Sequence, residues 1–240
     1  MNSLYKKSEI TFAVIWILIY VIGDSVAENL SIAIGMEKSI TFVFNAIITL
    51  ILIFWLNRNR LFLKYGLCMP SVSADRLLYY LPLVFIASCN LWFGVRMNLS
   101  VSETLFFIGS MLLVGFLEEL IFRGFLFKAM CKDGVKSAVI VSSITFGIGH
   151  IVNLFNGSGM SVTANLCQIC SAIAIGLMFV MIFYTGKSLL PCILTHSILN
   201  SLSVFANAPD TAWADIAVSA VITIAAVWYT LFIIRNYKRA

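Results

Sequence analysis

Charge is the component that this sequence has least of. Asp, Glu, Lys and Arg make up 11% of its 240 residues, against about 25% in an ordinary soluble domain. So little charge excludes a soluble globular domain and a disordered chain. The six cysteines are scattered, mostly within apolar stretches, and do not indicate a disulfide scaffold. Although the net charge is +5, too few soluble residues remain to form a basic nucleic-acid-binding surface, so we expect no nucleic-acid partner.

Hydrophobic residues are correspondingly abundant in the chain. They make up 61% of it, and the mean hydropathy is +0.99. A membrane span needs roughly 20 apolar residues, so the length leaves no room for a separate soluble domain. We expect an all-α polytopic membrane protein, a single membrane-embedded domain over 1–240, with about eight transmembrane helices in one bundle around an intramembrane polar site. The apolar runs predict spans at 10–30, 40–56, 77–95, 104–127, 135–152, 162–184, 189–206 and 216–234.

The distribution of basic residues predicts the orientation, because Lys and Arg collect in cytoplasmic loops. On one side of the eight-span layout lie only Lys38 and Arg96, and Arg123 falls inside a span. The other side carries the remaining basic residues, which are Lys6, Lys7, Arg58, Arg60, Lys64, Arg76, Lys128, Lys132, Lys136, Lys187, Arg235, Lys238 and Arg239. We therefore predict an integral protein of the cell membrane, embedded in the lipid bilayer with both termini in the cytoplasm.

The first span allows a second interpretation. Lys6-Lys7, an apolar run and Ser25-Val26-Ala27 are also typical of a secretory signal with a small-residue cleavage site. We favour an uncleaved span, in which Asp24 and Glu28 share one helix face that is turned to water or to the bundle.

Ionisable side chains inside a span are costly and usually mark function. The span at 104–127 contains Glu118, Glu119 and Arg123. Glu119 and Arg123 are four residues apart, so we expect them to pair along a helix. Glu118 points about 100° away from Glu119 and has no such helical partner, so its partners must come from other spans.

The only two histidines of the sequence, His150 and His196, also lie within spans, and Asn200 shares a helix face with His196. At a rise of about 1.5 Å per residue, Glu118 lies roughly 15 Å from Lys128 and the two histidines lie roughly 14–21 Å from the nearest basic loop. We therefore expect Glu118, His150, His196 and Asn200 in one layer of the membrane.

These four side chains suit hydrolysis by an activated water. A Glu and a His can hold and deprotonate the water, while a second His and an Asn amide can donate hydrogen bonds to an oxyanion. Glu118, His150 and His196 are equally a possible zinc set, although their spacing is not that of the zincins. Each residue also has a structural interpretation, since membrane His and Asn often make helix contacts and a Glu-Arg pair is often structural.

Three segments together resemble a known family. Glu118-Glu119-x-x-x-Arg123, Phe146-x-x-x-His150 and His196-x-x-x-Asn200 are similar to the motifs of the CAAX-protease and bacteriocin-processing family, also called the abortive-infection family, which includes the type II CAAX prenyl endopeptidases. The resemblance covers 105–205, which we expect to be the motif-bearing catalytic core.

The resemblance implies an intramembrane endopeptidase of the glutamate type, favoured over a metalloprotease, with no cofactor favoured and zinc as the alternative. By carry-over, Glu118 and His150 activate the water, and His196 and Asn200 form the oxyanion site. Glu119 supports the site with Arg123, and Phe146 shapes the pocket. The implied substrate is a peptide or lipidated protein, and bacterial relatives are linked to bacteriocin processing.

Two other classes remain open from the sequence. The first is a non-catalytic membrane scaffold or immunity protein of the same family. The second is a transporter or ion pathway, since intramembrane Glu and His also serve proton relays. We rank the transporter last because the paired broken segments of transporter folds are missing.

Overall fold

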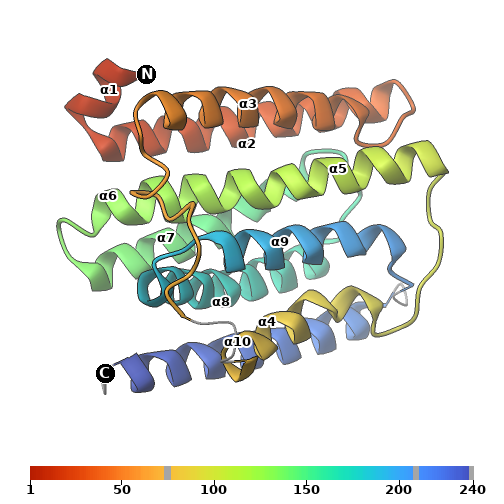
Figure 1. The fold of residues 1–240 in the computed structure, drawn as a ribbon. Helices are drawn as coiled ribbons and strands as arrows, with labels where there is room; N and C mark the ends of the chain where they lie inside the picture. Colours follow the sequence, from red (N-terminus) through yellow and green to blue (C-terminus); the bar gives the residue numbers. More distant parts are fainter. Residues whose placement is uncertain (73–76, 208–210, 238–240) are drawn as a thin grey trace.

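The structure, a computed structural model, describes residues 1–72, 77–207 and 211–237. In this part of the chain the elements are helices, and the only β pairing is an isolated bridge between Val95 and Ala206. The expected all-α fold is therefore confirmed (Figure 1). The α-helices are α1 (Asn2–Lys7), α2 (Glu9–Ala33), α3 (Ser39–Arg58), α4 (Leu77–Ala87), α5 (Val101–Glu118), α6 (Lys128–Met130), α7 (Val135–Gly149), α8 (Val162–Gly186), α9 (Leu190–Leu202) and α10 (Ala212–Tyr237). The other helices are the 3₁₀ segments η1 (Cys89–Leu91), η3 (His150–Leu154) and η4 (Ser203–Phe205), and the π-helix η2 (Glu119–Phe127).

Six helical segments within the described ranges are long and apolar enough to cross a membrane. They are Glu9–Ala33, Ser39–Arg58, Val101–Met130, Val135–Leu154, Val162–Gly186 and Ala212–Asn236. Each corresponds to a span expected from the sequence. The chain is therefore a polytopic integral membrane protein.

The other two expected spans form shorter helices. The 77–95 segment yields α4, which contains Pro82 and is about 16 Å long, and the 189–206 segment yields Leu190–Phe205, which is about 24 Å long. Both are shorter than the roughly 30 Å hydrocarbon core of a bilayer. Within the described residues, the eight expected segments are thus six full-length helices and two shorter ones.

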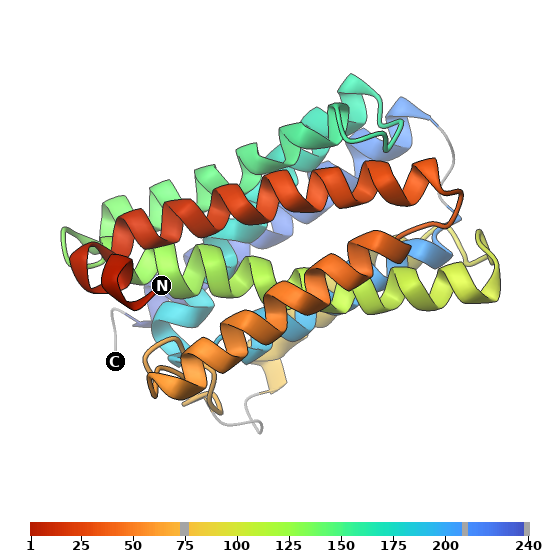
Figure 2. The ribbon, with the colours of Figure 1, turned by 90° about the horizontal axis from the view of Figure 1, so that it is seen from above.

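The helices pack along one common direction (Figures 1 and 2). Helix α8 packs between α7 and α10, while α5 packs against α3 and α9. Helix α2 covers α3 and the π-helix η2. Because α5 continues directly into η2, the longest helical run, Val101–Met130, contacts helices on several sides and forms the centre of the bundle.

The two ends of the bundle differ in charge. Helix α1 and the last turns of α10 lie at the same end (Figure 1). This basic end carries the described basic residues Lys6, Lys7, Arg58, Arg60, Lys64, Lys128, Lys132, Lys136, Lys187 and Arg235. At the opposite end lie Lys38 and Arg96. Arg76, Lys238 and Arg239 fall outside the described residues.

Candidate active site

The two adjacent glutamates stand where the helix changes type. Glu118 is the last residue of α5, and Glu119 is the first residue of the π-helix η2, whose nine residues are all buried. A π-helix has wider turns than an α-helix and occurs frequently at functional sites. This change of helix type was not predicted from the sequence.

Glu119 is the centre of a fully buried ion-pair network. Arg123 Nη1 donates to Glu119 Oε1 at 3.0 Å, and His196 Nδ1 lies 2.9 Å from the same oxygen. The side chains of Glu119 and Arg123 have no exposed surface. The predicted Glu119–Arg123 pair is therefore present, and it compensates two charges that would be costly to bury alone.

Phe146 packs against the charged part of this network. The Arg123 guanidinium carbon lies 4.0 Å from the centre of the Phe146 ring, a cation–π contact. The same ring meets the rings of His150 and His196 edge-on, with ring centres 5.1 and 5.7 Å away. Phe146 therefore orients three polar side chains with one apolar surface.

Glu118 finds its partners on other helices, as the sequence predicted. Tyr20 on α2 donates its hydroxyl to Glu118 Oε1 at 2.8 Å, and His196 Nε2 on α9 lies 3.5 Å from Glu118 Oε2. His196 consequently faces one glutamate with each ring nitrogen. Its ring links Glu118, which lines the cavity described below, to the fully buried Glu119.

Tyr20 is the residue that sequence reasoning missed. It is 4% exposed, and it precedes Asp24 by four residues and Glu28 by eight. Residues at this spacing lie on one face of a helix. The polar stripe along an otherwise apolar helix was a signal that could have identified Tyr20.

His150 and Asn200 complete the layer. His150 lies where α7 becomes the 3₁₀ segment η3, and its Nδ1 is 3.1 Å from the carbonyl oxygen of Phe146. The buried Asn165 amide donates to the His150 carbonyl oxygen at 2.8 Å. Asn200 lies one turn after His196 on α9. The structure thus brings together all four residues of the expected layer, because Glu118, His150, His196 and Asn200 line one cavity.

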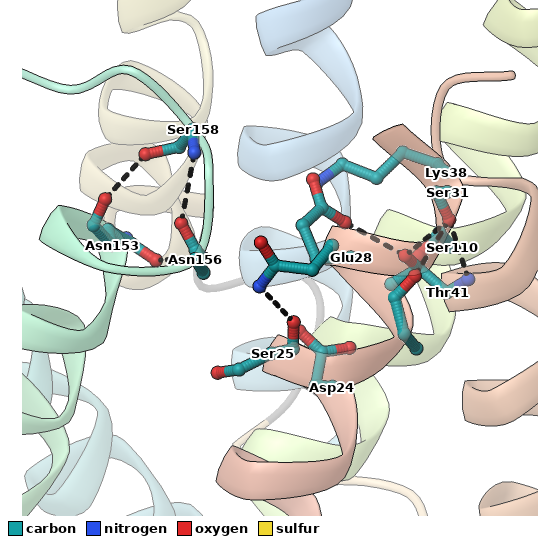
Figure 3. Close-up of polar contacts among 12 residues, drawn as sticks. Asp24, Ser25, Glu28, Ser31, Lys38, Thr41, Ser110, Asn153, Asn156 and Ser158 are labelled. Atoms are coloured by element: carbon teal, nitrogen blue, oxygen red, sulfur yellow. Dashed lines mark hydrogen bonds and ion pairs between the residues drawn. The ribbon is translucent and has the colours of Figure 1, made fainter. Parts of the chain in front are cut away.

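This cavity has a volume of about 600 Å³, within the usual range for ligand sites. Beyond the four candidate residues it is lined on one side by Asp24 and Glu28, which share a face of α2 as expected. Asp24 accepts a hydrogen bond from the buried Asn45 amide at 2.9 Å, and Glu28 pairs with Lys38 (Figure 3).

The residues of the alternative zinc set have protein partners in the structure. His196 directs its ring nitrogens to two different carboxylates, and His150 Nδ1 faces a backbone carbonyl. Among the residues that the structure describes, no group of three His, Cys, Asp or Glu side chains could hold a metal ion.

Comparison with known proteins identifies the segment that carries the motifs. No curated protein and no solved structure matches the chain. A family model, described as type II CAAX prenyl endopeptidase Rce1-like, matches residues 100–202. The match begins after Tyr20 and includes every candidate residue from Glu118 to Asn200. Residues 100–202 are therefore similar to the Rce1-like CAAX proteases, the resemblance that the three motifs indicated.

Proposed function

We propose that this protein is an intramembrane endopeptidase that hydrolyses a peptide bond near the terminus of a membrane-associated peptide or protein. One observation carries the proposal: Glu118, His150, His196 and Asn200, contributed by three helices, line a single cavity inside the bundle. A polar layer of this kind is expensive to bury in a membrane protein unless it has a function.

Glu118 is the proposed general base. Its carboxylate accepts a proton from a water that His150 helps to hold, and the water oxygen forms a bond to the carbonyl carbon of the substrate. When the carbon–nitrogen bond breaks, the proton passes from Glu118 to the leaving nitrogen. Tyr20 fixes the Glu118 carboxylate for both transfers.

His196 and Asn200 are the proposed oxyanion donors. His196 Nδ1 faces Glu119 Oε1 and its Nε2 faces the cavity beside Glu118. The Asn200 amide lies one turn further along the same helix. Donors aimed at the developing negative charge stabilise the transition state. Glu119 and Arg123 then act by holding the His196 ring in place.

The test compares the peptides of cells that carry the native protein with those of cells that carry Glu118→Gln or His150→Ala. We expect peptides to be lost in both variants while the proteins still insert and fold. Glu103→Gln on the same helix is the matched control, because Glu103 forms a capping box with Ser100 that Gln preserves. Unchanged peptides in both variants would instead support a non-catalytic scaffold or immunity protein.

The proposed reaction uses no metal, because a Glu and a His together can activate the water. Purified protein should therefore cleave its substrate at the same rate before and after strong chelation, and should contain no zinc stoichiometrically. Loss of activity on chelation, with recovery on adding zinc, would favour the metalloprotease alternative.

We propose further that the basic end faces the cytoplasm, so that both termini lie there in the cell membrane. The charge difference between the two ends of the bundle supports this orientation. Maturation of a bacteriocin-type peptide is one reaction that suits such an enzyme.

A further inference from the structure

The catalytic cavity extends toward one end of the bundle only. From the layer of Glu118 it continues to side chains at the end opposite the basic loops, namely Glu28, Lys38, Asn153, Asn156, Ser158, Met160, Ala206 and Asp215. Among the described residues that line it, none belongs to the basic loops at 59–67, 131–134 or 187–189. The cavity therefore extends away from the basic end of the bundle.

Helix α2 gives the length of this extension. Tyr20 binds Glu118, Asp24 lies about 6 Å further along the helix, and Glu28 lies about 12 Å further. All three line the cavity. The passage thus continues for at least two helical turns beyond the proposed general base.

Aromatic packing closes the opposite direction. Phe125 on η2, seven residues beyond Glu118, lies between Phe12, Trp55 and Tyr65, with ring centres 5.2, 6.1 and 4.9 Å away. Phe12, Tyr65 and Phe125 are each at most 2% exposed. This packing separates the catalytic layer from the basic end.

The walls at the open end are polar and face one another (Figure 3). We call Glu28, Lys38, Asn153, Asn156 and Ser158 the polar mouth. On one wall Lys38 pairs with Glu28; on the other Asn156 donates to Asn153 at 3.0 Å and Ser158 donates to the Asn153 carbonyl oxygen. Amide side chains both donate and accept hydrogen bonds, as the backbone of an extended peptide also does.

We propose that the substrate reaches Glu118 through the polar mouth, from the side of the membrane opposite the basic loops. With the basic end in the cytoplasm, the cleavable segment then lies on the non-cytoplasmic side. The substrate class is a membrane-associated peptide or protein tail that is exposed on that side, and not a lipidated C-terminus in the cytoplasm. This inference rests on the proposed function and orientation.

Cysteine labelling tests the location of the mouth without any need for activity. Ser158→Cys places a thiol at an exposed position of the polar mouth, and Lys136→Cys places the matched control thiol at an exposed position of the basic end. Each is treated with a membrane-impermeant maleimide in right-side-out and in inverted membrane vesicles, and adducts are counted above those of the native chain. Asn156→Cys is the second variant at the mouth.

We expect the Ser158→Cys thiol to react in right-side-out vesicles and the Lys136→Cys thiol in inverted ones. Reaction of the Ser158→Cys and Asn156→Cys thiols only in inverted vesicles would overturn the proposal. This result is independent of whether the protein cleaves peptides, so failure of the proposed function remains distinguishable.

A blocking experiment tests the route itself. A bulky maleimide attached to the Ser158→Cys thiol should reduce cleavage at least tenfold relative to the same variant before labelling, whereas the labelled Lys136→Cys variant should keep its rate. Equal rates for the labelled and unlabelled Ser158→Cys protein would show that substrate enters by another path, and the proposal would then be wrong.

Discussion

Gly115 sets the distance between the two helices that carry the glutamates and His196. A β-carbon at this position would lie 2.6 Å from the backbone nitrogen of Ser197 and 2.8 Å from its α-carbon. Ser197 also donates its hydroxyl to the Leu112 carbonyl oxygen at 3.0 Å, which ties α9 to α5 at the same level. The Ser197 hydroxyl would lie nearer still, but its rotation would not relieve the two backbone contacts.

The expected effect of Gly115→Ala follows from these distances. Ordinary contact begins at 3.4 Å, so α9 must move away from α5 by about 0.8 Å. His196 precedes Ser197 and lies 2.9 Å from Glu119 and 3.5 Å from Glu118, so its ring moves with the helix. A misplacement of about 1 Å can cost roughly 100-fold in rate, and overpacking of a buried site costs about 1–3 kcal/mol of stability.

The assay measures the initial rate of cleavage of a peptide identified from the native and Glu118→Gln comparison, together with thermal unfolding in detergent. Gly186→Ala is the matched control, since a β-carbon there has no neighbour within 4 Å, and we expect its rate and stability to be those of the native protein. A Gly115→Ala protein that cleaves at the native rate would refute the argument that this close helix contact positions His196.

Two further substitutions test the partners of the glutamates. Tyr20→Phe removes a hydrogen bond to a carboxylate, worth about 1.5–3 kcal/mol. We expect kcat to fall roughly 10–100-fold and the pH profile of kcat to shift, with little change in KM. An unaltered pH profile would show that Tyr20 only packs against its neighbours. Arg123→Gln leaves Glu119 buried without its charge partner, which should lower the free energy of unfolding by about 3–5 kcal/mol. The control is Arg58→Gln at the membrane surface, and the unfolding of both variants is measured in detergent. Equal stability of the two variants would contradict this expectation.

The features that the sequence predicted correctly depend on neighbours along the chain. A run of apolar residues forms a membrane helix wherever it stands, and a Glu and an Arg four residues apart meet on the same helix. The six long spans and the Glu119–Arg123 pair follow from such local rules. The positions of basic residues likewise indicate where helices end, and no knowledge of the helix packing is needed.

The lengths of the two short helices could not be predicted in this way. Hydropathy remains high after α4 ends at Ala87, because Leu91, Trp92 and Phe93 continue the apolar run. The backbone nevertheless leaves the helix, and Gly94 adopts a positive φ of 93°, a conformation that side-chain-bearing residues rarely take. Side-chain polarity predicts burial in lipid, but it does not report where the backbone turns.

The Tyr20–Glu118 contact could not be predicted from the sequence either. Its two residues are 98 positions apart, so only the packing of α2 beside η2 brings them together. The same packing makes the Asp24 and Glu28 face of α2 a wall of the cavity.

The site is therefore assembled from two parts of the chain with different roles. The segment at 100–202, which carries the family match, contains Glu118, His150, His196 and Asn200 and so determines the chemistry that we propose. Helix α2 lies outside that match, yet it supplies the partner of Glu118 and one wall of the passage to it. On the proposed route a substrate passes this wall before it meets Glu118, so we expect changes in α2 to alter which peptides are admitted while the proposed catalytic residues stay the same. Proteins with the same three motifs can accordingly differ in substrate.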